Sequence, residues 1–449
     1  MTYREPGTYS EIVSKQTNES VDRALLMPLV IGTGATEMRR TEIITRGTGT
    51  TDTLPTSAKA IVSIGYSSKR TDFEQATDYK LNEDDSTKIE WLTEGNKPLE
   101  GETYAVTYTY NVTEDQYLPK LVTSQTLQSI YGSDVKEDGS INNIVTAASI
   151  MFEEGVQAVW MLQVKETTPG KVSASDYENA LENHAQFIES VWRIVPADES
   201  SDINKVIDRH IEKCSTYEER KERCVVYCCP EANDVATASS VISTVGAYAE
   251  EKQNERITLT YPNKATRIFS DGIVRQVKGS FIAAAYAGIE AAMPVFNSKT
   301  RAVTTVFNEL LGPKLTRGQK NELAAKGVLI FEQPDGAGED IFCRHQLTTD
   351  MSSVDTRENS IFGIKDFASK YIRKSLDIYV GKYNITADLV TKITGSTNSA
   401  ISELIQMEYI LSGSIISVSQ DALNPDSIIV EILIDVPYPC NSIEITIVL

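Results

Sequence analysis

The side chains best suited to nucleophilic or metal chemistry in this sequence are six cysteines and three histidines. The two types come closest together in Cys343-Arg344-His345, where the alternation of a strand would place the thiol and the imidazole on one face. Such a pair can act as nucleophile and base when a third group orients the imidazole. Because the pair would need that group as well, we favour a structural role for it.

The other cysteines and histidines also favour structural roles. Cys224, Cys228 and Cys229 lie in the apolar run Cys-Val-Val-Tyr-Cys-Cys, which predicts a buried strand. An extended strand cannot turn three such thiols onto one metal ion, whereas disulfides between subunits of an assembly stay open as an alternative. His184 and His210 fall on amphipathic helix patterns and are expected to be solvated. Reduced thiols in a cytosolic chain are expected for the whole set, which is Cys214, Cys224, Cys228, Cys229, Cys343 and Cys440.

Residues 31–37, Ile-Gly-Thr-Gly-Ala-Thr-Glu, follow a predicted strand and resemble the start of a dinucleotide-binding loop. The third glycine of that fingerprint is replaced by Glu37, whose carboxylate would repel a pyrophosphate, so we expect a plain turn. No Walker loop and no Gly-x-Ser-x-Gly elbow occurs in the sequence. Lys136 stands where a calcium loop beginning at Asp134 needs an oxygen ligand. We therefore expect no catalytic residue, no cofactor and no metal.

Composition narrows the possible classes further. Among 449 residues, 43 Lys plus Arg stand against 63 Asp plus Glu, which gives a formal net charge of −20. That acidity argues against direct nucleic-acid binding, although a local basic patch stays open. No apolar run reaches the ~18 residues of a membrane span, and the first residues contain no apolar signal region, so neither membrane insertion nor secretion is expected. The length predicts about three domains.

Strands and long helices alternate between residues 155 and 331. Apolar strands are predicted at 157–164, 191–195, 224–229, 256–261 and 328–331. Helices are predicted at 176–190, 202–219, 234–251 and 281–291, followed by a capped helix that stops at Gly327. This alternation predicts right-handed βαβ crossovers and a doubly wound α/β domain with a mainly parallel sheet covered on both faces. The apolar run from Ala24 to Gly32 is of the kind that such a sheet buries.

The regions on either side have a different character. Thr and Tyr dominate at 41–112, where strands predicted at 60–64, 89–92 and 103–110 indicate a small inserted all-β domain. The last hundred residues mix helices with strands predicted at 415–418, 428–436 and 443–449. The last of these strands and an extended stretch near the N-terminus could each add to the sheet of a neighbouring subunit. The residues expected in these intersubunit arms are Thr8, Tyr9, Ser10, Glu11, Ile12, Val13, Ile443, Ile445, Ile447 and Leu449.

The order of these features resembles the contractile tail sheath proteins of bacteriophages and related injection particles. The likeness is sharpest in the helix–Gly–strand of 315–330, the strand at 341–349, the helix ending in Gly381-Lys382 and the paired strands after Leu411. The resemblance implies a central domain of subtilisin-like topology without catalytic residues, an inserted β domain and a C-terminal α+β domain. The expected division is an N-terminal arm at 1–22, the first core strand at 23–40, the β domain at 41–112, the central domain at 113–335, the C-terminal domain at 336–436 and a C-terminal arm at 437–449.

The resemblance also implies a function. The chain would be a non-enzymatic structural subunit that polymerises into a helical sheath around an inner tail tube and contracts to drive the tube through a host cell envelope. Its partners would be further copies of itself, the inner tube protein, and baseplate and tail terminator proteins. Its place would be the tail of a virion or of a phage-tail-like particle, assembled in the bacterial host cytoplasm.

The sequence leaves the role of one basic stretch and an alternative function open. The C-terminal domain of similar sheaths lies innermost, so a basic stretch could face an acidic tube or could be an ordinary solvated helix face; its residues are Lys365, Lys370, Arg373 and Lys374. The alternative function is an α/β hydrolase-type enzyme with a β accessory domain. The missing nucleophile motif and the small number of histidines count against that alternative.

Overall fold

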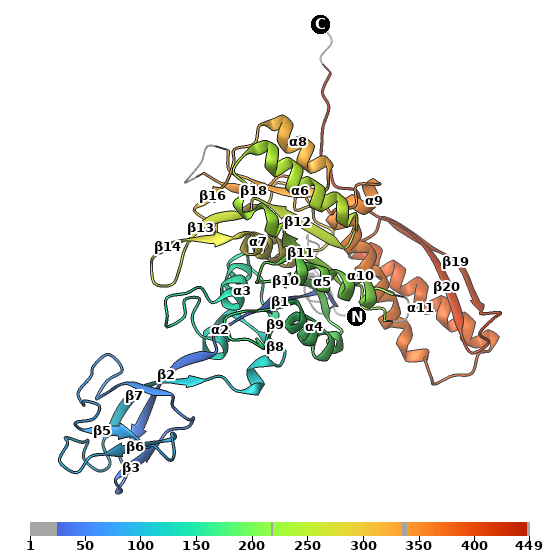
Figure 1. Cartoon of the computed structure of the whole chain (residues 1–449). Helices are drawn as coiled ribbons and strands as arrows, with labels where there is room; N and C mark the ends of the chain where they lie inside the picture. The colour runs from blue at the N-terminus through green and yellow to red at the C-terminus, as the bar shows by residue number, and fades with distance from the viewer. Residues whose placement is uncertain (1–24, 217–218, 335–338, 447–449) are drawn as a thin grey trace, which may run out of the picture.

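A nine-stranded mixed sheet lies at the centre of the computed structural model, which describes residues 25–216, 219–334 and 339–446 (Figure 1). Pairing is parallel through the middle of the sheet and antiparallel at both edges. From edge to edge the strands are β15 (Val303–Thr304), β18 (Ile341–Cys343), β17 (Val328–Glu332), β12 (Ile257–Tyr261), β11 (Cys224–Cys228), β10 (Val191–Pro196), β1 (Met27–Gly32), β9 (Val159–Gln163) and β8 (Lys120–Val122).

Helices cover both faces of this sheet, as the alternation predicted. One face carries α2 (Ser124–Tyr131), α3 (Asn143–Glu153) and α7 (Gly279–Ala292). The other carries α4 (Ala174–Asn183), α5 (Ser201–Cys214), α6 (Ala238–Lys252) and α8 (Arg317–Ala325). The Ala-rich α7 is buried along nearly its whole length. A Cβ at Gly288 would lie 3.0 Å from the backbone of Met151, so glycine is what permits α3 and α7 to pack this closely.

The parallel strands follow a doubly wound order. Along the sheet β9, β1, β10, β11, β12 and β17 are the second, first, third, fourth, fifth and sixth of these strands in the chain. After β1 the chain first adds β9 on one side and then crosses over to add β10 and the later strands on the other side. The strand order therefore reverses between β1 and β10. The carboxyl ends of these two strands form the place where a doubly wound sheet usually binds a ligand.

Residues 37–111 form a separate pair of small antiparallel sheets, drawn apart from the main body in Figure 1. Their own apolar core contains Ile64, Trp91 and Val106. The sheet begins at Glu37, four residues before the predicted range, because β2 runs straight on after the turn that follows β1. The strands are β2 (Glu37–Thr45), β3 (Thr51–Thr53), β4 (Ala60–Gly65), β5 (Tyr79–Leu81), β6 (Lys88–Trp91) and β7 (Thr103–Asn111).

The C-terminal part combines helices with one hairpin. It contains α9 (Val354–Arg357), α10 (Asn359–Leu376), α11 (Ala387–Gln406), β19 (Ser412–Gln420) and β20 (Ile428–Asp435). The helices share an apolar core with Trp192 of β10 and Cys224 of β11, so this part packs directly against the central sheet. In Figure 1 the hairpin lies along the outer side of α10 and α11.

Several predicted elements differ from the structure. The helices predicted at 176–190 and 202–219 end earlier, at Asn183 and Cys214. Residues 443–446 form no strand, although a strand was predicted at 443–449. A third small sheet was not predicted: β13 (Lys264–Ile268) pairs with β14 (Val274–Lys278) and β16 (Glu309–Leu311). The described part of the chain also contains short 3₁₀ turns, η1 (Glu114–Tyr117), η2 (Ala185–Phe187), η3 (Pro230–Asp234) and η4 (Asp377–Tyr379).

A helix that spans a bilayer is about 20 residues long and predominantly apolar. Within the three described ranges, no helix combines the length and the apolar character needed to cross a membrane.

Candidate assembly surface

A carboxylate fills the position at which this sheet would be expected to bind a phosphate. Asp198, just after β10, accepts hydrogen bonds from the Thr33 backbone N–H at 2.7 Å, the Asn143 side-chain amide at 2.7 Å and the Tyr177 hydroxyl at 2.9 Å. Burial and the neighbouring Asp198 raise the pKa of Tyr177 well above its usual value. Because these donors already serve a negative group, the crevice between β1 and β10 is unsuited to an anionic cofactor.

Glu37 was predicted to exclude a pyrophosphate from the loop after β1. In the structure Glu37 lies at the start of β2 and pairs with Lys59 of the inserted sheets. Residues 33–36 form an irregular connection with a bend at Thr36. Asp198 is the acidic group that occupies the crevice. No local sequence signal could identify Asp198, since it lies 165 residues from Thr33.

A second arrangement resembles a nucleophile, base and orienting acid. The His210 Nε2 atom lies 3.5 Å from the Cys214 Sγ atom, and its Nδ1 atom lies 3.4 Å from a carboxylate oxygen of Glu182. However, the Arg223 guanidinium donates to the same Nε2 atom at 2.6 Å, so that nitrogen is already used as an acceptor. Cys214 is 2% exposed and burial raises its thiol pKa. This group is therefore a buried polar network, and the prediction that His210 is solvated was wrong.

Cys343 and His345 do not form the pair that their spacing allowed. Cys343 is fully buried in β18, and burial raises its thiol pKa. The His345 Nε2 atom instead lies 2.7 Å from a Glu358 carboxylate oxygen. The predicted burial of Cys224, Cys228 and Cys229 is confirmed, because all three are at most 2% exposed on or just after β11.

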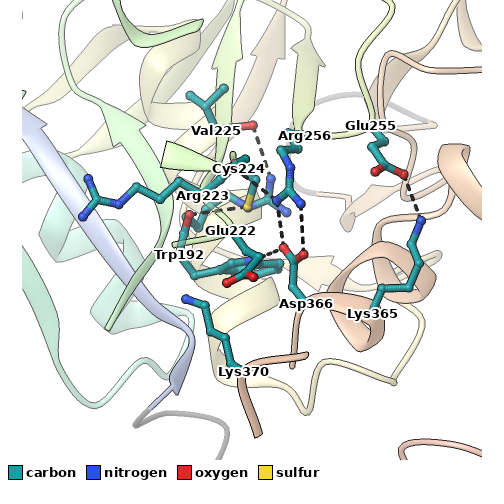
Figure 2. Close-up of polar contacts among 12 residues, drawn as sticks. Trp192, Glu222, Arg223, Cys224, Val225, Glu255, Arg256, Lys365, Asp366 and Lys370 are labelled. Atoms are coloured by element: carbon teal, nitrogen blue, oxygen red, sulfur yellow. Dashed lines mark hydrogen bonds and ion pairs between the residues drawn. The ribbon is translucent and has the colours of Figure 1, made fainter. Parts of the chain in front are cut away.

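The four basic residues predicted as a strip all lie on α10, but they differ in their surroundings. Figure 2 shows Lys365 paired with Glu255, at 2.9 Å. Lys370 is 8% exposed, contacts the Leu25 carbonyl at 3.4 Å, and has a pKa lowered by burial. Arg373 pairs with Glu222 at 2.6 Å, whereas Lys374 is exposed.

The same helix is joined to the central sheet by buried polar contacts. In Figure 2 Asp366 accepts from the Trp192 indole at 2.8 Å and from the Arg256 guanidinium at 3.1 and 3.2 Å. Nearby, Arg193 of β10 makes two 2.6 Å bonds to Glu290 of α7 and a 3.2 Å bond to Asn359 of α10. A charged group this deep needs such partners, so these contacts fix the C-terminal helices on the sheet.

The β19–β20 hairpin presents open backbone edges and a partly apolar outer face. Its inner face, with Ile415 and Ile432, packs on the core of α10 and α11. On the outer face Ile416 is 65% exposed and Leu433 is 62% exposed. No other described strand pairs with either edge of the hairpin. Unpaired edges next to exposed aliphatic side chains are where an extended segment of another chain can add.

The segment after β20 carries part of the predicted arm. Ile443 and Ile445 are 79% and 81% exposed, and the last described residues run away from the body in Figure 1. Ile447, Leu449 and the N-terminal stretch from Thr8 to Val13 lie outside the described residues.

The chain resembles known proteins in sequence and in fold. Residues 5–143 match a family model described as a domain of unknown function, DUF4815. A tail sheath protein of Mycobacterium phage Bxz1 is 25% identical over 376 residues, covering 81% of this chain. The chain spans 61% of the length of that relative.

Solved structures share the fold. The helical sheath of the anti-feeding prophage in its contracted state matches with a TM-score of 0.57 at 13% identity, over 75% of this chain and 90% of the other. The sheath of an extracellular contractile injection system, also contracted, gives 0.56 at 12% identity, over 75% and 87% of the two chains. A sheath tail protein from Listeria innocua gives 0.50 at 13% identity, over 93% and 94%. The resemblance found in the sequence is thereby confirmed.

Proposed function

We propose that this chain, similar in sequence to a phage tail sheath protein and alike in fold to contractile sheath subunits, is itself a structural sheath subunit. It would polymerise into a helical sheath around an inner tail tube and contract to drive that tube through a host cell envelope. Further copies of the chain, the tube, and baseplate and terminator proteins would be its partners. The protein would be located in the tail of a virion or tail-like particle, which would be assembled in the host cytoplasm.

The observation that carries the proposal is the unpaired β19–β20 hairpin, followed in the chain by an exposed, Ile-rich segment. A two-stranded hairpin is marginal by itself and gains from added strands. Ile443 and Ile445 are too exposed to contribute to the stability of a single chain. We infer that such a segment pairs with the hairpin of a neighbouring subunit.

The free energy of pairing one C-terminal arm with a neighbouring hairpin is small, which suits a contact that is repeated along an assembly. Each backbone hydrogen bond gained would contribute roughly 0.5–1.5 kcal/mol net, and each fully buried Ile would add about 1.5–3 kcal/mol. Ordering the segment would cost about 1–2 kcal/mol per residue. These contributions nearly cancel for one arm, so stability would come from many copies along a helix.

Lys374 is the basic residue on α10 that we propose for contact with the tube. Lys365 and Arg373 already pair with Glu255 and Glu222, and Lys370 is buried. The broader strip suggested by the sequence therefore narrows to one exposed lysine.

Two finer points belong to the same proposal. The division at 22, 40, 112, 335 and 436 and the subtilisin-like character of the central domain rest on the family resemblance. The absence of enzymatic activity is also part of the proposal. It is supported by Asp198 in the crevice and by the buried state of Cys214.

The test is deletion of residues 443–449. We expect a folded monomer by circular dichroism and no tubes by negative-stain microscopy, whereas the full chain forms tubes. Ile443→Asp with Ile445→Asp should act like the deletion, because charges cannot enter an apolar strand contact. Glu444→Gln is the matched control and should still assemble. Normal tubes from the deletion variant, or its outright unfolding, would show that the segment does not join subunits.

A further inference from the structure

The segment that follows β20 is held to the body at several points before it becomes exposed. Pro437 and Pro439 lack backbone N–H groups, so the β20 ladder cannot continue through them. Val436 is 9% exposed in the C-terminal core. The Tyr438 hydroxyl donates to Asp355 of α9 at 2.6 Å.

The last of these contacts is made by Asn441. Its side-chain NH₂ group donates to Glu358 at 2.9 Å, and its side-chain Oδ1 atom accepts from the Thr300 hydroxyl at 3.5 Å. Two residues further on, Ile443 is 79% exposed. The docked part of the segment therefore ends at Asn441.

The Glu358 side chain is rigidly placed to accept the hydrogen bond from Asn441. It is fully buried between α9 and α10, where His345 contacts it at 2.7 Å and Gln346 donates to it at 3.4 Å. Its backbone forms a bridge with Leu347. The body of the protein thus fixes the Glu358 carboxylate in place. The segment after β20 supplies a further donor to this carboxylate, the side-chain amide of Asn441. A buried carboxylate that loses a donor is disfavoured, which opposes release of the segment.

We propose that Glu358 anchors the C-terminal arm at Asn441 and so sets where and in which direction the arm leaves the subunit. This rests on the proposed function, in which the arm reaches a neighbouring hairpin. An arm that begins at a fixed point samples fewer positions than one released from Val436 onward, so less entropy is lost when it pairs. His345, which the sequence suggested as a base, is a positioning residue for the anchor.

The chain carries its own probe for this contact. Cys440 is the exposed cysteine, next to Asn441, and the other five cysteines are buried. A nitroxide label on Cys440 reports the mobility of the anchored segment without any assembly taking place.

The experiment compares Asn441→Ala and Glu358→Gln with Ser442→Ala as the matched control. We expect an immobile label in the unmodified chain and in Ser442→Ala. The ratio of mobile to immobile label should rise roughly tenfold in Asn441→Ala, since a hydrogen bond to a charged group is lost. It should rise by less in Glu358→Gln, because the glutamine amide oxygen can still accept from Asn441 but carries no charge. Both variants should also form fewer tubes while keeping the circular dichroism of the unmodified chain. Asn441→Ala keeps the test valid if Glu358→Gln fails to fold.

The possible outcomes separate the two proposals. An equally immobile label in Asn441→Ala overturns the anchor. A mobile label together with normal tube formation overturns its role in placing the arm. If the label responds as expected but the unmodified chain forms no tubes, the anchor stands and the sheath function is wrong.

Discussion

Replacing Glu290 with alanine is expected to destabilise severely the junction where α7, the central sheet and the C-terminal helices meet. Glu290 and Arg193 have side chains 3% and 2% exposed. The substitution removes two 2.6 Å charge-assisted bonds from a guanidinium that cannot lose its proton. Arg193 then keeps weaker hydrogen bonds, to the Val225 carbonyl at 3.3 Å and to Asn359 at 3.2 Å, and its contact with the Trp192 ring.

The expected loss is about 3–5 kcal/mol in the free energy of unfolding, the usual result of leaving one buried charge unpaired. That is about a fifth or more of the 5–15 kcal/mol stability of a typical domain. Glu178→Ala is the control, because Glu178 and Arg209 are 54% and 62% exposed and 3.3 Å apart. An exposed pair of that kind contributes no more than about 1 kcal/mol.

Urea unfolding followed by tryptophan fluorescence measures both losses, and Trp192 lies beside Arg193 in the same junction. Replacing both partners, Arg193→Met with Glu290→Leu, should restore most of the stability because no charge is then left buried. A loss below about 1 kcal/mol for Glu290→Ala, or a double variant less stable than the single one, would refute this reasoning.

Three further results are expected. Burial and Arg223 lower the pKa of His210 from 6.5 to about 4, so the unfolded chain binds the proton first and the stability of the fold falls as the pH drops from 6.5 to 4. Between pH 7 and pH 5, the free energy of unfolding of His210→Gln, measured by urea titration, should fall by about 2 kcal/mol less than that of the unmodified chain. An equal pH dependence of the two proteins would contradict this. Burial raises the pKa of Glu154 from 4.5 to about 7, so stability falls as pH rises through that range; Glu154→Gln should melt higher than the unmodified chain at pH 8 and equally at pH 4. Lys374→Glu should weaken co-sedimentation with the tube and leave the melting temperature unchanged. Arg373→Glu should lower the melting temperature, because Arg373 pairs with Glu222. Equal melting temperatures of the two variants would contradict the assignment of Arg373 to a structural pair and of Lys374 to the tube contact.

Much of the architecture was predictable from local patterns. The alternation of apolar strands with amphipathic helices predicted the doubly wound sheet, and the Thr- and Tyr-rich stretch predicted β4, β6 and β7. The helix predicted at 281–291 is α7. Such patterns are readable because helix and strand periods depend on residues close together in the chain.

The character of the candidate site was decided by contacts distant in sequence. Asp198 meets Thr33 across 165 residues, Asn441 meets Glu358 across 83, and Arg373 meets Glu222 across 151. An amphipathic pattern cannot show that His210 faces Arg223, or that Lys370 is buried at Leu25. The sequence by itself determined most of the helices and the main strands and which of their faces are apolar, but it indicated neither the β13–β14–β16 sheet nor the lack of a strand at 443–446. Whether a charged side chain is solvated, paired or buried was decided by the tertiary structure alone, because burial and electrostatic partners depend on which elements pack together.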